Sequence, residues 1–410
     1  MISIISEIIY KLIYPFLLLF HRQCGYSDEA IKLKKGYVEF NTENKKVIMF
    51  HGVSVGEVNA IEKLIKKTRE AFPDIKIVVT TGTNTGQEIA HKKLDGIVDL
   101  VTYFPFDTPS CDKRFLDNIK PDIILVAETE IWPNIAIECK KRDIKLCIIN
   151  GRISDRTYKS YRKLKFFFKP LLNMYAGIYT QSSEDLDKFL SLGTNSGTTK
   201  RMNNLKFDIT APVVDFDFDK SGRVLLCAST HSGEDKICLD VYKALKEKHN
   251  DLKLIIAPRH LTHKDEVETI VGESGFTYGF RSEGIQSMAD IDIMIFDTMG
   301  ELGKMFAYSD ISFIGGSFNK TGGHNPLESI IFSKPVISGP SIQNFKDIYA
   351  IIQNAEAGFV VKTKNEFLDV ANRLLSDYKF YIKTSKSGED VFKAQQGALQ
   401  YVINVIKDIL

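Results

Sequence analysis

The chain has 410 residues, a length that favours two domains over one. Lysine and arginine number 54 and aspartate and glutamate 52, a formal charge of +2, so bulk charge gives no indication of nucleic-acid binding. The six cysteines are scattered, without zinc-ligand spacing or a dense disulfide framework, which is typical of a protein in a reducing cytoplasm.

The first 20 residues are almost wholly apolar. Ser3, Glu7 and Lys11 interrupt them at intervals of four, so these three side chains share one face of a helix. Such a segment is long enough to span a bilayer, but its polar stripe favours a helix that lies in the membrane interface. A cleaved signal peptide and a helix packed on the protein's own surface are the other interpretations. We predict a membrane-associating helix over residues 1–22.

From residue 47, short apolar runs alternate with helical patterns, which indicates parallel sheets covered by helices on both faces. The strands expected before residue 208 are 47–50, 75–80, 100–103, 123–126, 146–149 and 177–180. Residues 211–222 contain Pro212 and several aspartates, and are predicted to be a linker. The strands expected after it are 224–227, 254–257, 293–296, 311–314 and 335–338. We therefore expect two similar α/β halves that bind ligands in a cleft between them.

Polar residues gather where the expected strands of the first half end. Ser54 and Glu57 have the spacing of a capping box, which gives Glu57 a structural role. The functional interpretation makes Glu57 a general base. The threonines and glycines of 80–86 could hold a polar substrate or serve only as turn and cap residues. Glu128 and Glu130 follow a central strand two residues apart, so we expect both on one strand face.

The segment 156–172 mixes cations with aromatic residues and, as one helix, has a strongly basic face. One interpretation is a solvated face beside a packed aromatic stripe. The other is a surface for anionic lipid or a phosphorylated acceptor, which the apolar N-terminus favours.

Residues 311–328 follow the order strand, glycine-rich loop and helix. Gly322 and Gly323 allow a ligand to approach the backbone, and the N–H groups at a helix start attract anions. Glu328 comes just after them, within reach of a ribose hydroxyl. An ordinary strand-to-helix loop explains the same residues. Arg259 follows another expected strand and could clamp a phosphate.

Together these segments resemble the 3-deoxy-D-manno-octulosonic acid (Kdo) transferases of lipopolysaccharide assembly. The matching segments are 51–57, 80–86, 103–107, 128–133, 150–154, 204–208, 257–260, 297–302, 315–317 and 322–328. They cover nearly the whole chain in order. The departures are mild: Asn203 stands where the family usually has Gly, Ala127 replaces a bulkier residue, and Ser329 stands where Pro is frequent.

The resemblance implies a GT-B fold, with two Rossmann-like domains that face each other across a cleft. The implied boundaries are an acceptor domain over 23–210, a linker over 211–222, a CMP-sugar donor domain over 223–390 and a terminal helix over 391–410 that returns to the first domain. The implied reaction is an inverting, metal-independent transfer of Kdo from CMP-Kdo to a lipid A precursor. The protein would be peripheral or singly anchored at the cytoplasmic face of the inner membrane, with no cofactor besides the co-substrate CMP-Kdo and no nucleic-acid partner.

The resemblance also assigns roles to residues. Glu57 would be the catalytic base, and Glu130 would assist it. The expected donor-binding residues are Arg259, His260, Met299, Gly300, Glu301, Gly322, Gly323, Asn325 and Glu328. The expected acceptor-binding residues are Ser54, Gly56, Thr81, Thr83, Glu128 and Arg152. No metal ligands are expected.

Three alternatives remain on the sequence alone. Another GT-B transferase could use a UDP- or ADP-sugar. A sugar-nucleotide epimerase shares the architecture but needs no lipid acceptor, so the apolar N-terminus and the segment 156–172 disfavour it. The chain could also be a catalytically silent, membrane-bound nucleotide-binding module.

Overall fold

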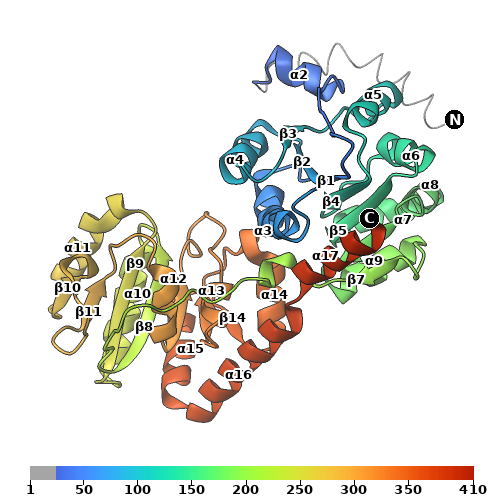
Figure 1. Ribbon diagram of the computed structural model, residues 1–410. Helices are drawn as coiled ribbons and strands as arrows, with labels where there is room; N and C mark the ends of the chain where they lie inside the picture. The colour runs from blue at the N-terminus through green and yellow to red at the C-terminus, as the bar shows by residue number, and fades with distance from the viewer. Residues whose placement is uncertain (1–24) are drawn as a thin grey trace. The chain divides into compact units, whose positions relative to one another are not determined.

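The computed structural model describes residues 25–410, and the helix expected at 1–22 lies outside them. The chain divides into two compact units. Unit 1 runs to Asp208 and includes Gln395–Leu410, and unit 2 is Ile209–Ala394. Each unit contains a seven-stranded parallel sheet flanked by helices (Figure 1). This arrangement confirms the predicted α/β class.

The sheet of unit 1 has the strand order β3-β2-β1-β4-β5-β6-β7. Its strands are β1 (Val47–His51), β2 (Lys76–Thr81), β3 (Leu100–Tyr103), β4 (Ile123–Ala127), β5 (Lys145–Gly151), β6 (Gly177–Thr180) and β7 (Thr199–Arg201). Its helices are α2 (Asp28–Lys34), α3 (Val55–Ala71), α4 (Asn84–Leu94), α5 (Pro109–Ile119), α6 (Pro133–Lys141), α7 (Asp155–Lys163), α8 (Lys165–Leu172), α9 (Ser183–Leu192), the 3-10 turn η1 (Leu205–Phe207) and α17 (Ala398–Ile409).

The central strands of unit 1 are apolar on both faces, as a parallel sheet covered by two helical layers requires. In β1, Val47 and Met49 join one buried cluster, whereas Ile48 and Phe50 join the cluster on the opposite face. Burial of each such side chain contributes roughly 1.5–3 kcal/mol to stability. These central strands therefore fix the position of the loops that follow them.

The sheet of unit 2 has the strand order β10-β11-β9-β8-β12-β13-β14. Its strands are β8 (Arg223–Thr230), β9 (Leu252–Pro258), β10 (Tyr278–Phe280), β11 (Ile293–Ile295), β12 (Ile311–Ile314), β13 (Val336–Ser338) and β14 (Gly358–Val360). Its helices are α10 (Glu234–Lys246), η2 (Leu261–His263), α11 (Lys264–Gly272), η3 (Arg281–Glu283), α12 (Leu302–Met305), η4 (Phe306–Tyr308), α13 (Leu327–Ile330), η5 (Gln343–Phe345), α14 (Lys346–Asn354), α15 (Lys364–Ser376) and α16 (Tyr378–Gln395).

The C-terminal region differs from the single helix expected over 391–410. It contains the end of α16 and then α17, and Gly397 separates the two helices with a φ of +96°, a left-handed conformation that glycine adopts readily. The carboxylate of Asp208 accepts the N–H groups of Gly397 at 2.7 Å and Leu399 at 2.5 Å, which caps the start of α17. Val402 and Ile406 of α17 are buried in the same cluster as Phe50 of unit 1.

Two further segments differ from expectation. Residues 156–172 form α7 and α8 rather than one helix, with the break at Leu164, whose φ and ψ are −107° and 30°. Across residues 211–222 the chain is irregular, but Phe218 is buried and Asp219 makes a β-bridge with Ser287. None of the helices in residues 25–410 has the length and apolar character needed to cross a membrane.

Candidate functional site

Glu57 lies in the first turn of α3, just beyond the carboxyl end of β1. Its Oε2 accepts the N–H of Val53 at 2.5 Å, and its Oε1 lies 3.4 Å from the hydroxyl of Ser54. Ser54 is the N-cap residue, but its side chain caps no helix N–H group. The capping-box interpretation is therefore only half correct, because Glu57 reaches back past the cap residue to Val53.

The carboxyl group of Glu57 has a strongly shifted pKa. Burial raises this pKa to about 7, the hydrogen bond from Val53 opposes the shift, and the charges of Glu128 and Glu130 add to it. A carboxylate that titrates near neutral pH is well matched to general-base catalysis.

Glu128 and Glu130 follow β4, the strand paired with β1. Glu128 has a φ of +59°, which ends the extended conformation. The expectation that both carboxylates lie on one strand face is therefore wrong, because Glu128 belongs to the turn after β4 and Glu130 to the irregular segment beyond that turn. A carboxylate oxygen of Glu128 lies 3.8 Å from Nε of Arg152, and burial raises the pKa of Glu130. Three carboxylates and one arginine thus gather beyond β1, β4 and β5.

The predicted acceptor-binding threonines have structural roles. Thr81 is fully buried as the last residue of β2, and its hydroxyl donates to Oε1 of Gln87 at 2.6 Å. Thr83 caps α4: its hydroxyl accepts the N–H of Gly86 at 3.1 Å and donates to the carbonyl of Val53 at 3.2 Å. That these two side chains also bind the acceptor stays a prediction, because their hydroxyls already have partners within the protein. Gly56 is exposed at the start of α3.

Unit 2 contains a pocket of about 450 Å³, a volume within the usual range for small-molecule sites. Four predicted donor-binding residues line it: Arg259, Gly300, Asn325 and Glu328. The other lining residues received no role from the sequence: Ala228, Ser229, Leu302, Gly303, Phe306, Ile314, His324 and Phe345. The pocket therefore joins residues of β8 and β12 to the segments that follow β9, β11, β12 and β13.

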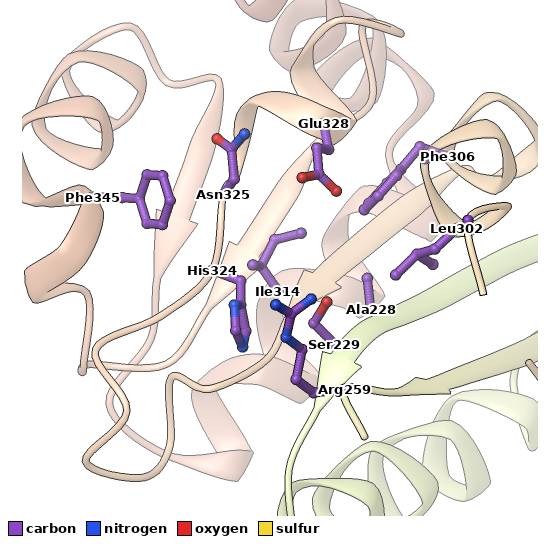
Figure 2. Close-up of a pocket in the computed structure, with 12 residues that line it drawn as sticks. Ala228, Ser229, Arg259, Leu302, Phe306, Ile314, His324, Asn325, Glu328 and Phe345 are labelled. Carbon is purple, nitrogen blue, oxygen red and sulfur yellow. The ribbon is translucent and has the colours of Figure 1, made fainter. Parts of the chain in front are cut away.

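Figure 2 shows the guanidinium of Arg259 and the carboxylate of Glu328 directed into this pocket from opposite sides. The backbone N–H of Arg259 donates to the carbonyl of Thr230 at 2.9 Å, which fixes the start of the loop after β9. Burial raises the pKa of Glu328, and the charge of Arg259 and a hydrogen bond from Asn325 oppose the shift. The pocket thus offers one cation and several hydrogen-bonding groups.

Five predicted donor-binding residues do not line the pocket. His260 and Met299 are exposed, and 77% of the surface of Met299 is accessible. Glu301 is already engaged: it accepts the hydroxyl of Thr298 at 2.7 Å and lies 3.3 Å from Arg281. The hydrogen bond from Thr298 holds the pKa of Glu301 below its ordinary value.

Gly322 and Gly323 are the other two, and both have positive φ, +97° and +78°. The N–H of Gly323 donates to the carbonyl of Gly316 at 2.8 Å, and the helix that follows, α13, has only four residues. The amide of Gly323 is therefore engaged within the loop, and the contact of a phosphate with N–H groups near Gly322 and Gly323 stays a prediction. The two glycines are needed for the shape of the loop.

Some of the lining residues that were not predicted lie in segments that the sequence pattern indicated, and others do not. His324 belongs to the Gly-Gly-His-Asn sequence, and Ser229 follows an apolar run, so both lay inside segments already singled out. Phe345 lies 20 residues beyond Asn325, and no pattern in the neighbouring sequence indicates that it lines a pocket. No group of three or more His, Cys, Asp or Glu side chains within residues 25–410 is arranged to hold a metal ion.

A family model described as "3-Deoxy-D-manno-octulosonic-acid transferase (kdotransferase)" matches residues 29–209. The chain is 31% identical over 372 residues to the 3-deoxy-D-manno-octulosonic acid transferase of Haemophilus influenzae, covering 88% of this chain and 87% of that protein. It is 37% identical over 339 residues to a bifunctional glycosyltransferase/methyltransferase of Fusobacterium nucleatum, covering 80% of this chain. The match spans about half of that protein, 52% of its length.

Among solved structures, the UDP-GlcNAc 2-epimerase from Neisseria meningitidis bound to UDP-GlcNAc superposes with a TM-score of 0.56. The alignment covers 88% of this chain and 100% of that one at 14% identity, so the likeness concerns the fold. With the two parallel sheets, it confirms the predicted GT-B fold. From the identity to the H. influenzae protein over most of both chains, we conclude that this chain belongs to the 3-deoxy-D-manno-octulosonic acid transferase family of glycosyltransferases.

Proposed function

We propose that the protein transfers Kdo from CMP-Kdo to a lipid A precursor in lipopolysaccharide biosynthesis, by a single displacement that inverts the anomeric centre. Family membership supports the transferred sugar. The observation that supports the mechanism best is the Glu57 carboxylate, which is fixed by the Val53 N–H and has a pKa of about 7.

In this proposal Glu57 accepts the proton of a sugar hydroxyl on the acceptor while the hydroxyl oxygen attacks the anomeric carbon of Kdo. General-base catalysis of this kind contributes roughly 10²- to 10⁴-fold to the rate. Glu128 and Glu130 accept hydrogen bonds from neighbouring hydroxyls and orient the acceptor. Arg152, 3.8 Å from Glu128, limits the accumulation of negative charge there.

The donor occupies the pocket of unit 2. Arg259 binds its phosphate, because a guanidinium forms strong, charge-assisted hydrogen bonds to phosphate oxygens. Glu328 accepts hydrogen bonds from the ribose, and Asn325, whose Oδ1 accepts the N–H of Leu327 at 3.1 Å, helps to fix that carboxylate. Backbone groups of Gly300 line the same pocket.

We further propose that unit 1 contacts the cytoplasmic face of the inner membrane through α7 and α8. α7 has no buried residue, and 80% of the surface of Phe166 in α8 is accessible. The exposed cations of this surface are Arg156, Lys159, Arg162, Lys163, Lys165 and Lys169. An exposed aromatic ring among cations is suited to an anionic lipid surface.

The deciding experiment incubates the purified protein with CMP-Kdo and a lipid A precursor, and follows CMP release and the mass of the lipid product. We expect CMP release that depends on the lipid, and a product heavier by one or more Kdo residues. CMP release without lipid dependence contradicts the proposed acceptor. Thermal stabilisation by UDP but not by CMP contradicts the proposed donor and favours the alternative of a UDP-sugar enzyme.

Arg259→Ala tests the donor site separately. A hydrogen bond to a charged group is worth about 1.5–3 kcal/mol, so CMP affinity should fall roughly 10- to 150-fold. Arg373→Ala is the matched control, because Arg373 belongs to the same unit but stacks on Phe380 in a structural contact. Calorimetric titration with CMP gives the affinities. Equal loss of CMP and acceptor affinity in Arg259→Ala contradicts the assignment.

A further inference from the structure

Two histidine rings meet beside the donor pocket in an arrangement that the proposed mechanism does not use. The Nε2 atoms of His231 and His324 are 3.0 Å apart, and the rings are nearly parallel, with centroids 5.3 Å apart and an interplanar angle of 10°. At this distance one Nε2 donates a proton and the other accepts it. The pair therefore holds at most one proton beyond its neutral state, because two protonated Nε2 atoms would both be donors.

Buried structure holds the two histidines in place. Glu234, 1% exposed at the start of α10, accepts the backbone N–H of His231 at 3.0 Å and that of Gly316 at 2.7 Å through one carboxylate oxygen. A Cβ atom at Gly316, where φ is +67°, would lie 3.0 Å from Nε2 of His324. One carboxylate thus fixes the segment that carries His231 to the turn against which His324 packs.

Several charged groups face His324, the pocket-lining member of the pair. Burial lowers the pKa of His324 to about 4, and the charges of Arg259, His231 and His260 act in the same direction. Glu328 lines the pocket on the side opposite Arg259 (Figure 2). In the free protein at neutral pH, His324 is therefore neutral, and Arg259 provides the positive charge of the pocket.

His231 faces a different set of groups. Burial lowers its pKa, the carboxylates of Glu234 and Asp235 oppose the shift, and His260 and Arg259 add to it. Asp235 is itself paired with His263 at 2.9 Å, and the rings of His231 and His260 meet edge-on at 5.8 Å. A phosphate bound at Arg259 adds negative charge beside a neutral pair, and negative charge favours protonation of a nearby imidazole.

We propose that the His231–His324 pair takes up one proton when the phosphate of CMP enters the pocket, and that His231 is the positioning residue that keeps this proton at His324. The inference rests on the proposed function. In the transfer, the bond between the anomeric carbon and the phosphate oxygen breaks, and its electron pair remains on that oxygen. The acceptor's proton goes to Glu57. The CMP that leaves carries one more negative charge, and the shared proton offsets it.

The test is calorimetric titration of the full chain with CMP at pH 7.5, in HEPES and in Tris, whose ionisation enthalpies differ. The difference between the observed enthalpies gives the number of protons taken up. We expect about one proton per CMP, and none for cytidine, which has no phosphate. Enthalpies that yield no proton uptake with CMP overturn the inference, whereas the proposed transferase function stands if CMP still binds.

Variants locate the proton. His231→Asn and His231→Gln should still bind CMP but lose the uptake, whereas His91→Asn should retain it, because His91 lies on α4 of unit 1 and does not line the donor pocket. Uptake that persists in both His231 variants, or that His91→Asn also abolishes, overturns the inference. If the wild-type chain binds UDP and not CMP, the proposed function itself fails, an outcome distinct from CMP binding without proton uptake.

Discussion

Glu57 and Glu234 occupy similar positions in the two units, but their surroundings differ. Each belongs to the first turn of the helix that follows the central strand, β1 or β8, and each accepts a backbone N–H from the preceding loop. Glu234 is buried and accepts three further N–H groups, from Gly316, Ser317 and Phe318, at 2.7–2.8 Å. Glu57 is half-buried, and the loop that follows β4 brings it carboxylates instead.

This comparison separates a structural carboxylate from a reactive one. Four N–H groups satisfy both oxygens of Glu234, so its negative charge is stabilised and its role is to hold loops together. Glu57 has one such bond, and burial and like charge make its anionic form costly. A carboxylate in that state gains from accepting a proton. The carboxylate at the same position of the fold thus holds loops together in unit 2 and, in our proposal, accepts the proton of the acceptor in unit 1.

The largest expected effect is on turnover. In Glu57→Gln the amide oxygen can still accept the N–H of Val53, so the fold should survive, but no proton can be taken from the acceptor. We expect transfer to fall by about 10²- to 10⁴-fold, with CMP affinity unchanged. Glu62→Gln in the same helix is the control, because Glu62 only pairs with Lys66 and Lys93 at the surface. Near-normal turnover in Glu57→Gln contradicts the role of general base.

The same substitution in unit 2 should act on stability. Glu234→Gln replaces one carboxylate oxygen by an NH₂ group, which leaves two buried N–H groups facing a donor. An unsatisfied buried donor costs about 1–3 kcal/mol, so the free energy of unfolding should fall by roughly 2 kcal/mol or more. Denaturant titration measures this change, with Glu57→Gln as the matched control. Equal stability of the two variants contradicts the distinction drawn between these carboxylates.

Much of the fold follows from local sequence. The strands expected at 100–103, 177–180 and 311–314 agree with β3, β6 and β12, because continuous apolar runs mark buried parallel strands. β7, β10 and β14 were not predicted. Each has three residues and lies at or next to a sheet edge, so its residues need less apolar character.

The site was less predictable, because its details depend on contacts between loops. Arg259 and Glu328 could be singled out, since polar residues after strands in such folds gather near ligands. The burial of Thr81 was not predicted, because β2 extends one residue beyond the expected end of this strand. The hydrogen bond from Gly323 to Gly316 joins residues seven positions apart, and the pairing of His231 with His324 joins residues 93 positions apart. No local sequence pattern predicts either contact.

The pH dependence of transfer tests the surroundings of Glu57 directly. Its pKa rises from the ordinary 4.5 to about 7 on folding, so the folded state binds a proton more tightly than the unfolded state. The resulting stabilisation is present at low pH and is lost as the pH rises through 7. We expect turnover to rise with pH to a plateau above 7 and to be about tenfold lower at pH 6, as titration of a single base requires.

A pH–rate profile of the wild-type chain under saturating substrates measures the pH dependence of turnover, and thermal melts measure the pH dependence of stability. Glu57→Gln should be at least as stable as the wild type at pH 8 and gain no such advantage at pH 4, because Gln removes the unfavourable charge. A rising limb centred near pH 4.5 contradicts the raised pKa.

The smallest expected effect concerns the membrane-facing assignment of unit 1. Phe166→Ser removes an exposed ring from α8 among six exposed cations, whereas Tyr378→Ser removes a ring of similar exposure, 75%, from unit 2. Full burial of a phenylalanine is worth roughly 1.5–3 kcal/mol, and partial insertion less, so binding to anionic vesicles should weaken a few-fold in Phe166→Ser only.

Co-sedimentation with vesicles of anionic and of neutral lipid measures both variants in the full chain. Added salt should weaken the wild-type interaction with anionic vesicles, because the cations act through screened charges. If both variants bind anionic vesicles as tightly as the wild type, α7 and α8 do not face lipid. If both variants bind equally more weakly than the wild type, the contact with lipid is not specific to unit 1.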